Sequence, residues 1–383
     1  MREIYLDNGA TSFPKAPGVA ESMYNYLINI GCNVNRGAYK TSFEAENVVY
    51  ETRELLCELF NFNRTENVIF TKNVTESLNV LIKGLLKPGD HVIVSSMEHN
   101  AVIRPINSLV KKGVEFSRVI CNKEGVLNPD DIYGYIKPNT KAVVMTHASN
   151  VCGTILDLKR VGSICRERGI YFIIDAAQTA GFLDIDFNEL MADAIAFTGH
   201  KGLLGPQGIG GFLISDELAA ILDPFIEGGT GSLSDKEIQP EYMPDKFEAG
   251  TLNIPGIYGL NAALKYILKE GISSIKEKEL FLLEHFLEGI LNIPQIKIAG
   301  KKDLIDRTAV VSIDLPDSDN AIIAYNLYND YGIMTRCGLH CAPSAHQTLG
   351  TFPQGTIRFS FSYFNSLDDV RYTIDAINKA IRS

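Results

Sequence analysis

The feature that most restricts the fold of this sequence is the alternation of short apolar runs with helical stretches through its middle. The runs are NVIF (67–70), HVIVSS (91–96), KAVVMTHAS (141–149), YFIIDAAQ (171–178) and AIAFTGHKG (194–202). Several lack a two-residue alternation, as expected of strands buried on both faces of a parallel sheet. Helical periodicity separates them, for example in ESLNVLIKGLL (76–86) and LKRVGSICRERG (158–169). The pattern predicts a doubly wound, mostly parallel α/β domain.

The chain length and a change of pattern after Pro255 predict two domains. A chain of 383 residues is too long for one ordinary core. Beyond Pro255 come long helical stretches, a strand AVVSIDL, a loop carrying Arg336 to Cys341, a strand TIRFSFS and a C-terminal helix. We therefore expect a large domain at 16–258 and a smaller α+β domain at 259–383, with residues 1–15 packing on the small domain. The Gly-rich, polar run 227–244 is typical of an active-site lid or a subunit contact.

Composition excludes several classes of protein. The net charge of -10 argues against nucleic acid as a partner. No apolar run reaches the roughly 18–20 residues that span a bilayer, so no membrane partner is expected. The seven cysteines are odd in number and form no CxxC pair, and the seven histidines show no HxH or HxxxH pattern. We expect neither a disulfide framework nor a metal site, and a reducing cytoplasm as the location.

Reactive side chains follow four of the apolar runs. Asp175 ends YFIID, His200 and Lys201 follow AIAFTG, Asn150 follows VVMTHAS, and His99 follows HVIVSS. In an open parallel sheet, ligands bind beyond the carboxyl ends of the strands. The sequence therefore predicts that these side chains form one site.

The residue types match the needs of pyridoxal 5'-phosphate. A lysine, Lys201, forms the Schiff base, and a buried carboxylate, Asp175, keeps the pyridine nitrogen protonated. His99 offers a flat partner for the ring. A helix start offers N–H groups and hydroxyls to the phosphate, and it consists of Thr75, Glu76 and Ser77.

Each of these residues also has an ordinary interpretation. Lys201 alone is typical of a solvated loop, and Asp175 alone of a cap on the next turn. His99 alone is more often a hydrogen-bonded polar histidine, and Thr75 alone an N-cap. The prediction depends on their combination and order.

The motifs that carry these residues resemble those of the class V aminotransferases, which are fold-type I pyridoxal phosphate enzymes. They are YLDNGAT (5–11), NVTES (73–77), MEHNA (97–101), ASNVCGT (148–154), IDAAQ (174–178), TGHKGLLGPQGIG (198–210) and EAGTLN (248–253). The resemblance covers nearly the whole chain and is strongest to the cysteine desulfurase and selenocysteine lyase branch. It implies a fold-type I enzyme with pyridoxal phosphate as its cofactor.

The resemblance also implies a role for each matching residue. Lys201 is the Schiff-base lysine, Asp175 the partner of the ring nitrogen, and His99 the stacking ring. The phenolic oxygen is bound by Gln178 with Asn150 near it, and the phosphate by Thr75, Thr198 and His200. Thr251 reaches the phosphate of the neighbouring subunit, which implies a homodimer with shared active sites.

The C-terminal run TRCGLHCAPS resembles the Arg-x-Gly-x-His-Cys-Ala motif of one group of cysteine desulfurases. It implies that Cys341 is the nucleophile, that Arg336 lies in the substrate loop, and that Arg358 binds the substrate carboxylate, for which a planar guanidinium is suited. The implied reaction converts L-cysteine to L-alanine and leaves a persulfide on Cys341 for a sulfur-acceptor protein. His340 or a cationic arginine is a candidate for stabilising the thiolate.

Several alternatives stay open at this point. A selenocysteine lyase uses the same residues, and an aminotransferase or β-lyase of the same family gives Cys341 no covalent role. A non-enzymatic regulatory or sulfur-carrier protein is a further alternative, and Cys341 alone is typical of a buried loop cysteine. Tyr39 stands where related enzymes often carry histidine, so the sequence does not decide which residues form the substrate-side wall of the site.

Overall fold

The larger part of the molecule is built on one seven-stranded sheet. The computed structural model describes residues 2–34 and 37–382. From edge to edge the strands are β2 (Val68–Thr71), β8 (Gly210–Ile214), β7 (Ala194–Thr198), β6 (Tyr171–Asp175), β5 (Thr140–Thr146), β3 (His91–Ser95) and β4 (Glu115–Val119). Only β8 runs antiparallel to its neighbours. The predicted doubly wound, mostly parallel α/β domain is confirmed.

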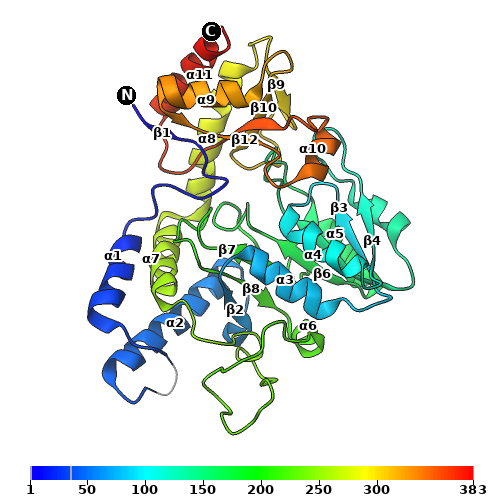
Figure 1. Ribbon diagram of the computed structural model, residues 1–383, viewed down its shortest axis with the longest axis vertical. Coiled ribbons are helices and arrows are strands. Elements are labelled where there is room, and N and C mark those ends of the chain that lie inside the picture. Colours follow the sequence, from blue (N-terminus) through cyan, green and yellow to red (C-terminus); the bar gives the residue numbers. More distant parts are fainter. Residues whose placement is uncertain (1, 35–36, 383) are drawn as a thin grey trace.

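Helices cover both faces of this sheet (Figure 1). They are α1 (Val19–Asn25) with a π-helical turn (Tyr26–Ile30), α2 (Lys40–Leu59), α3 (Val74–Leu85), α4 (Asn100–Val110), α5 (Leu158–Arg168), α6 (Asp216–Ile221) and α7 (Ile254–Glu270). Short 3-10 segments lie at Thr65–Asn67 and Pro129–Tyr135. Side chains of β3 alternate, so Val92 and Val94 pack with α3 and α4 while Ile93 joins the core with α2, α5 and α7. In the described ranges, no helix is long and apolar enough to cross a bilayer.

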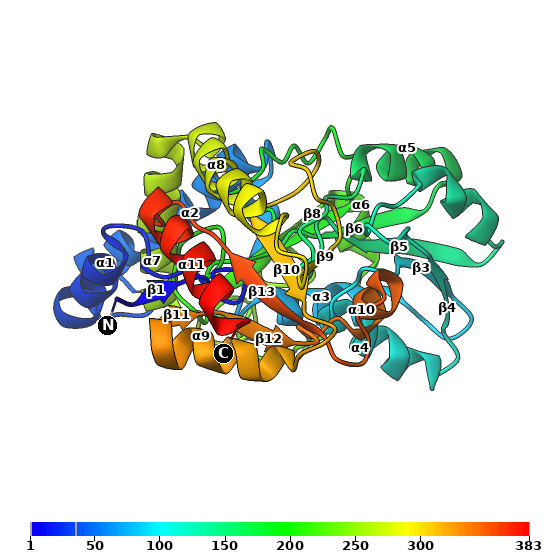
Figure 2. The same ribbon diagram turned by 90° about the horizontal axis from the view of Figure 1, so that it is seen from above.

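A smaller domain stands above one end of the large sheet (Figures 1 and 2). Its antiparallel sheet has the order β12 (Arg336–Gly338), β13 (Thr356–Ser360), β10 (Val310–Asp314) and β9 (Lys297–Ala299). Its helices are α8 (Ile272–Ile290), α9 (Asn320–Tyr331), α10 (Pro343–Leu349) and α11 (Leu367–Ala380). Near the N-terminus, β1 (Ile4–Tyr5) pairs in parallel with β11 (Ile333–Met334) of this domain.

The expected domain boundary at 258/259 falls inside α7. This helix packs on α1 and α2 of the large domain. Pro255 does not mark a break, because it lies in the first turn of α7, where proline is tolerated. We propose Gly271, between α7 and α8, as the boundary in its place.

The run 227–244 contains no regular helix or strand. In Figure 1 the connection between α6 and α7 extends away from the sheet on the side opposite the small domain. It exposes the apolar side chains of Leu233, Ile238 and Tyr242. Exposed apolar side chains on an irregular segment are typical of a surface that contacts another chain.

Candidate active site

The carboxyl ends of the central strands meet above a cavity of about 250 Å³. Thr146 at the end of β5 pairs with Asp175 at the end of β6, and β7 ends next to them at Thr198. The cavity is lined by Asn73, Val74, Thr75, His99, Thr146, Asn150, Asp175, Ala177, Gln178, His200 and Lys201. The fold therefore brings together seven of the residues that the sequence singles out.

Asp175 is a buried carboxylate at the end of β6, with 3% of its surface exposed. Burial raises the pKa of its carboxyl, while the N–H of Ala177 and the positive charge of Lys201 oppose that rise. The Ala177 N–H donates to Asp175 Oδ1 at 3.0 Å, so the side chain does cap the next turn as well. A cationic ring nitrogen next to Asp175 would compensate the negative charge of its carboxylate.

Lys201 lies in the turn that follows β7. Burial lowers the pKa of its amine to about 8, with a further decrease from Arg358 and Arg336 and an opposing effect of Asp175. A neutral amine is therefore within reach near neutral pH. This is the state in which lysine acts as a nucleophile or as a base.

The ring of His99 is fixed by the helix that it begins. His99 is the N-cap of α4, and its Nδ1 accepts the N–H of Ala101 at 3.0 Å. Burial and the nearby Lys201 charge lower the pKa of His99 to about 4, so the ring is neutral. The hydrogen bond sets the orientation of a flat, uncharged face on the cavity wall.

The structure contradicts the ordinary interpretation of Thr75 as the N-cap of α3. The N-cap is Asn73, whose Oδ1 accepts the N–H of Glu76 at 3.1 Å. Thr75 therefore lies in the first turn, and it lines the cavity beside free helix N–H groups. Glu76 is not brought to this cavity, because its Oε2 accepts the N–H of Lys72 at 2.6 Å and its side chain lines a different one.

Two buried polar atoms near α3 have no partner among the described residues. They are Thr198 Oγ1 and His200 Nδ1. A buried polar group without a hydrogen bond is costly, so such atoms usually mark a site for a ligand or water. Together with the hydroxyl of Thr75 and the α3 N-terminus, they form a set of groups suited to a phosphate.

Gln178 and Asn150 connect the cavity to other segments. Gln178 Nε2 donates to the carbonyl of Gly9 at 3.1 Å. Asn150 Nδ2 donates to the carbonyl of His340 at 2.8 Å, and the carbonyl of Asn150 accepts from Arg358 Nη1 at 3.0 Å. Asn150 therefore ties the large domain to the loop that carries Cys341.

Cys341 is exposed on that loop, so the interpretation as a buried cysteine is wrong. His340 and Cys341 have positive φ angles of 47° and 57°, which are uncommon for residues other than glycine. The carbonyl of Cys341 accepts the N–H of Asn100 at 2.7 Å, which docks the loop on the start of α4. Cys341 lines a second cavity of about 330 Å³, whose walls also include Thr75 and His99 of the first.

His340 does not supply a positive charge to Cys341. Burial and the neighbouring Arg358 lower the pKa of His340 to about 2. Its Nε2 pairs with Thr356 Oγ1 at 3.0 Å. The expectation that a charged His340 stabilises the thiolate is therefore wrong.

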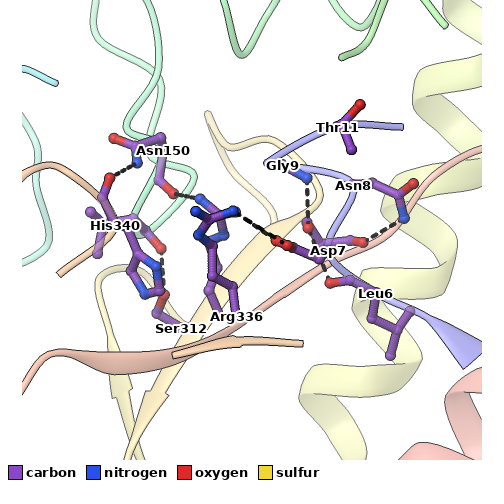
Figure 3. A network of polar contacts seen from close by, with 12 residues as sticks. Leu6, Asp7, Asn8, Gly9, Thr11, Asn150, Ser312, Arg336 and His340 are labelled. Atoms are coloured by element: carbon purple, nitrogen blue, oxygen red, sulfur yellow. Dashed lines mark hydrogen bonds and ion pairs between the residues drawn. The ribbon is translucent and has the colours of Figure 1, made fainter. Parts of the chain in front are cut away.

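Arg358 and Arg336 lie side by side at the small-domain end of the site, joined by a residue that the sequence did not single out. Asp7 accepts a hydrogen bond from Arg358 Nη2 at 2.9 Å and forms an ion pair with Arg336 Nη1 at 3.5 Å. In Figure 3, Asp7 extends from the N-terminal segment toward Arg336. Asp7 is the acidic residue of the YLDNGAT motif. Its place in that motif was the sequence signal that could have singled it out as a site residue.

Thr251 is not brought to the cavity of its own chain. It is exposed and lines two other cavities, of about 450 and 260 Å³. Its expected role in the site of a neighbouring subunit stays a prediction.

Comparisons with known proteins agree over the whole chain. The family model described as aminotransferase class-V matches residues 4–372. A probable cysteine desulfurase of Pyrococcus abyssi is 35% identical over 99% of this chain and 94% of its own length, and one of Methanothermobacter thermautotrophicus is 33% identical over 96% and 92%. A cysteine desulfurase structure from Thermococcus onnurineus has a TM-score of 0.93 and 33% identity, covering 99% of this chain and 95% of that one. One from Escherichia coli has a TM-score of 0.89 and 27% identity, covering 99% and 94%.

Proposed function

The chain belongs to the aminotransferase class-V family, and we propose that it is a pyridoxal phosphate-dependent cysteine desulfurase. The reaction is the conversion of L-cysteine to L-alanine with transfer of sulfur to Cys341. The observation that carries the proposal is the shared wall of two cavities. One contains Lys201 and Asp175, the other contains Cys341, and both are bounded by Thr75 and His99.

The residues of the first cavity fit pyridoxal phosphate. When bound, this cofactor supplies a cationic ring that accepts electron density from the substrate α-carbon. The buried Asp175 would pair with the ring nitrogen, His99 would lie against the ring, and Gln178 and Asn150 would lie near the phenolic oxygen. The unpaired Thr198 Oγ1 and His200 Nδ1 would bind the phosphate with Thr75. Lys201 would hold the aldehyde carbon as a Schiff base.

Each of the protein groups has a separate role in the proposed reaction. Arg358 binds the α-carboxylate, and the amine of Lys201 removes the proton from the α-carbon. The thiolate of Cys341 attacks the substrate sulfur, so that an S–S bond forms as the C–S bond breaks. A proton is then added to the carbon that carried the sulfur, and Lys201 returns a proton to the α-carbon, which gives alanine and a persulfide on Cys341. His99 keeps a fixed, neutral face beside these groups.

A homodimer with shared active sites is part of the proposal. Thr251 lines other cavities than the one that contains Lys201, and the connection between α6 and α7 exposes apolar side chains near it in sequence. The exposed position of Cys341 suits transfer of its persulfide to an acceptor protein. A cytoplasmic location stays a prediction from the free cysteines.

Product analysis tests the proposed reaction. Purified protein loaded with pyridoxal phosphate should convert L-cysteine to L-alanine, with sulfide released in equal amount when a thiol reductant is present. Without reductant, sulfide should lag behind alanine, because sulfur stays on the enzyme after the first turnovers. Alanine formation without any enzyme-bound sulfur would contradict the mechanism, and no alanine from either L-cysteine or L-selenocysteine would contradict the function.

The rate of cofactor uptake should depend on pH through Lys201. Only the neutral amine attacks the aldehyde, and burial lowers its pKa to about 8. Uptake by the cofactor-free protein should therefore rise about tenfold per pH unit below that value and level off above it. Stopped-flow absorbance between pH 6 and 9 measures this.

Asp175→Asn provides the control for this profile. The charge of Asp175 raises the pKa of Lys201, so its removal should shift the plateau to lower pH. A rate that stays flat from pH 6 to 9 in the unmodified protein would show that Lys201 is not the attacking group.

A further inference from the structure

Three charged side chains meet at the small-domain end of the active site. Arg336 on β12 and Arg358 on β13 are direct register partners in an antiparallel pair. Like charges placed opposite each other destabilise a sheet. Asp7 relieves this, because its Oδ1 accepts from Arg358 Nη2 at 2.9 Å while its Oδ2 lies 3.5 Å from Arg336 Nη1. The cluster therefore carries one net positive charge instead of two.

The two arginines have different environments. The side chain of Arg358 is 3% exposed, whereas that of Arg336 is 50% exposed. Arg358 also donates from Nη1 to the carbonyl of Asn150 at 3.0 Å, and its buried Nε has no partner in the described part of the chain. Nη1 and Nη2 each use one N–H in the contacts with Asn150 and Asp7, and a guanidinium has five donors, so Arg358 keeps donors for a bound carboxylate. Arg336 is half exposed, and its positive charge acts on Lys201 in the site.

The carboxylate of Asp7 is held in place by its neighbours in the chain. The Leu6 carbonyl accepts the Ser360 N–H at 2.8 Å, and the Gly9 N–H donates to Ser360 Oγ at 2.7 Å. Asn8 Nδ2 donates to the Ser360 carbonyl at 2.9 Å. Figure 3 shows Leu6, Asn8 and Gly9 next to Asp7. Because the residues on both sides of Asp7 are hydrogen-bonded to Ser360, its carboxylate cannot easily move away when a ligand enters.

We propose that Asp7 is a specificity-determining residue that restricts the site to amino acids with a single carboxylate. This inference rests on the proposed function, in which Arg358 binds the α-carboxylate. Two adjacent guanidinium groups by themselves would suit a dicarboxylate, with Arg336 taking the second acidic group. The fixed charge of Asp7, which is hydrogen-bonded to Arg358 and ion-paired with Arg336, lowers the positive charge of the cluster and repels that second group.

Equilibrium binding of L-alanine and L-aspartate to the holoenzyme tests this inference. Binding is followed by the change in the visible spectrum of the bound cofactor. In Asp7→Asn, the ratio of the Kd for L-aspartate to the Kd for L-alanine should fall by at least about tenfold. The ratio separates charge selection from general damage, which weakens both ligands. An unchanged or increased ratio would overturn the inference.

Three further variants control the measurement. Asp7→Glu keeps the charge and should keep the ratio close to that of the unmodified protein. Asp130→Asn removes a surface ion pair with Arg160, at 2.7 Å in this structure, and should leave the ratio unchanged. Adding Arg336→Gln to Asp7→Asn should abolish the gain for L-aspartate. A gain that survives without Arg336 contradicts the assigned role.

The test does not depend on sulfur chemistry. If Asp7→Asn fails to fold or to take up cofactor, Arg336→Gln alone decides, because it leaves Asp7 without one partner. The ratio should then rise, and a constant ratio would overturn the inference. A holoenzyme that binds both amino acids but makes no alanine from cysteine would contradict the proposed function and still permit this measurement.

Discussion

Lys201→Ala should abolish covalent retention of pyridoxal phosphate and reduce alanine formation from L-cysteine by about three orders of magnitude or more. In the proposed mechanism this amine holds the cofactor and moves the α-proton, and burial lowers its pKa to about 8. No nearby lysine replaces it on the wall of this cavity. Borohydride reduction followed by peptide mass spectrometry measures the covalent link directly, and turnover is measured on the same samples.

Lys246→Ala is the matched control for this loss. Lys246 is also buried, at 5% exposure, but its Nζ donates to the carbonyl of Ala219 away from the cavity, at 2.9 Å. This variant should retain the cofactor adduct on Lys201. If Lys201→Ala still carries a reducible adduct at the active site, the assignment of the Schiff-base lysine is wrong.

Cys341→Ala should keep the cofactor and the fold but lose sulfur transfer by at least about a hundredfold. The side chain is exposed and the loop is held through its backbone, by Asn100 and by Asn150 on the neighbouring carbonyl. Removing one sulfur atom therefore leaves the packing intact. The measurements are alanine formation from L-cysteine and detection of persulfide by mass spectrometry.

Cys337→Ala separates a specific role of Cys341 from the general loss of a thiol. Cys337 precedes it by four residues, is half-buried on β12, and has its pKa raised by burial. This variant should keep most of the activity. Full turnover by Cys341→Ala would instead favour an aminotransferase or β-lyase, in which this cysteine has no covalent part.

The large-domain sheet was predictable because its strands are buried on both faces. Runs such as YFIID and AIAFT are apolar up to their last residue, which is typical of strands buried on both faces. Two strands were missed for physical reasons. β4 is an edge strand with mostly exposed or half-buried side chains, and β8 contains two glycines and follows a Gly-rich turn.

The meeting of polar residues at one cavity was also predictable from the sequence. Asp175, Lys201, His99 and Asn150 each follow an apolar run, and parallel strands bring their carboxyl ends to one edge. The start of α3 shows the limit of this reasoning. Asn73 and Thr75 are both acceptable N-caps in sequence, and only the backbone conformation decided that Asn73 fills this position.

The charge state and partners of the C-terminal motif were decided by the tertiary structure alone. The sequence placed His340 beside Cys341, but burial against Arg358 keeps that histidine neutral. The sequence also separates Asp7 from Arg358 by 351 residues, and the pairing of the N-terminal segment with the small domain brings them into contact. Local pattern specifies which strands and helices form, whereas burial and long-range charge contacts depend on how those elements meet. By itself, the sequence determined the fold class and which polar residues meet at the carboxyl ends of the strands, because both follow from local pattern. Only the folded chain decided which charges surround the two arginines.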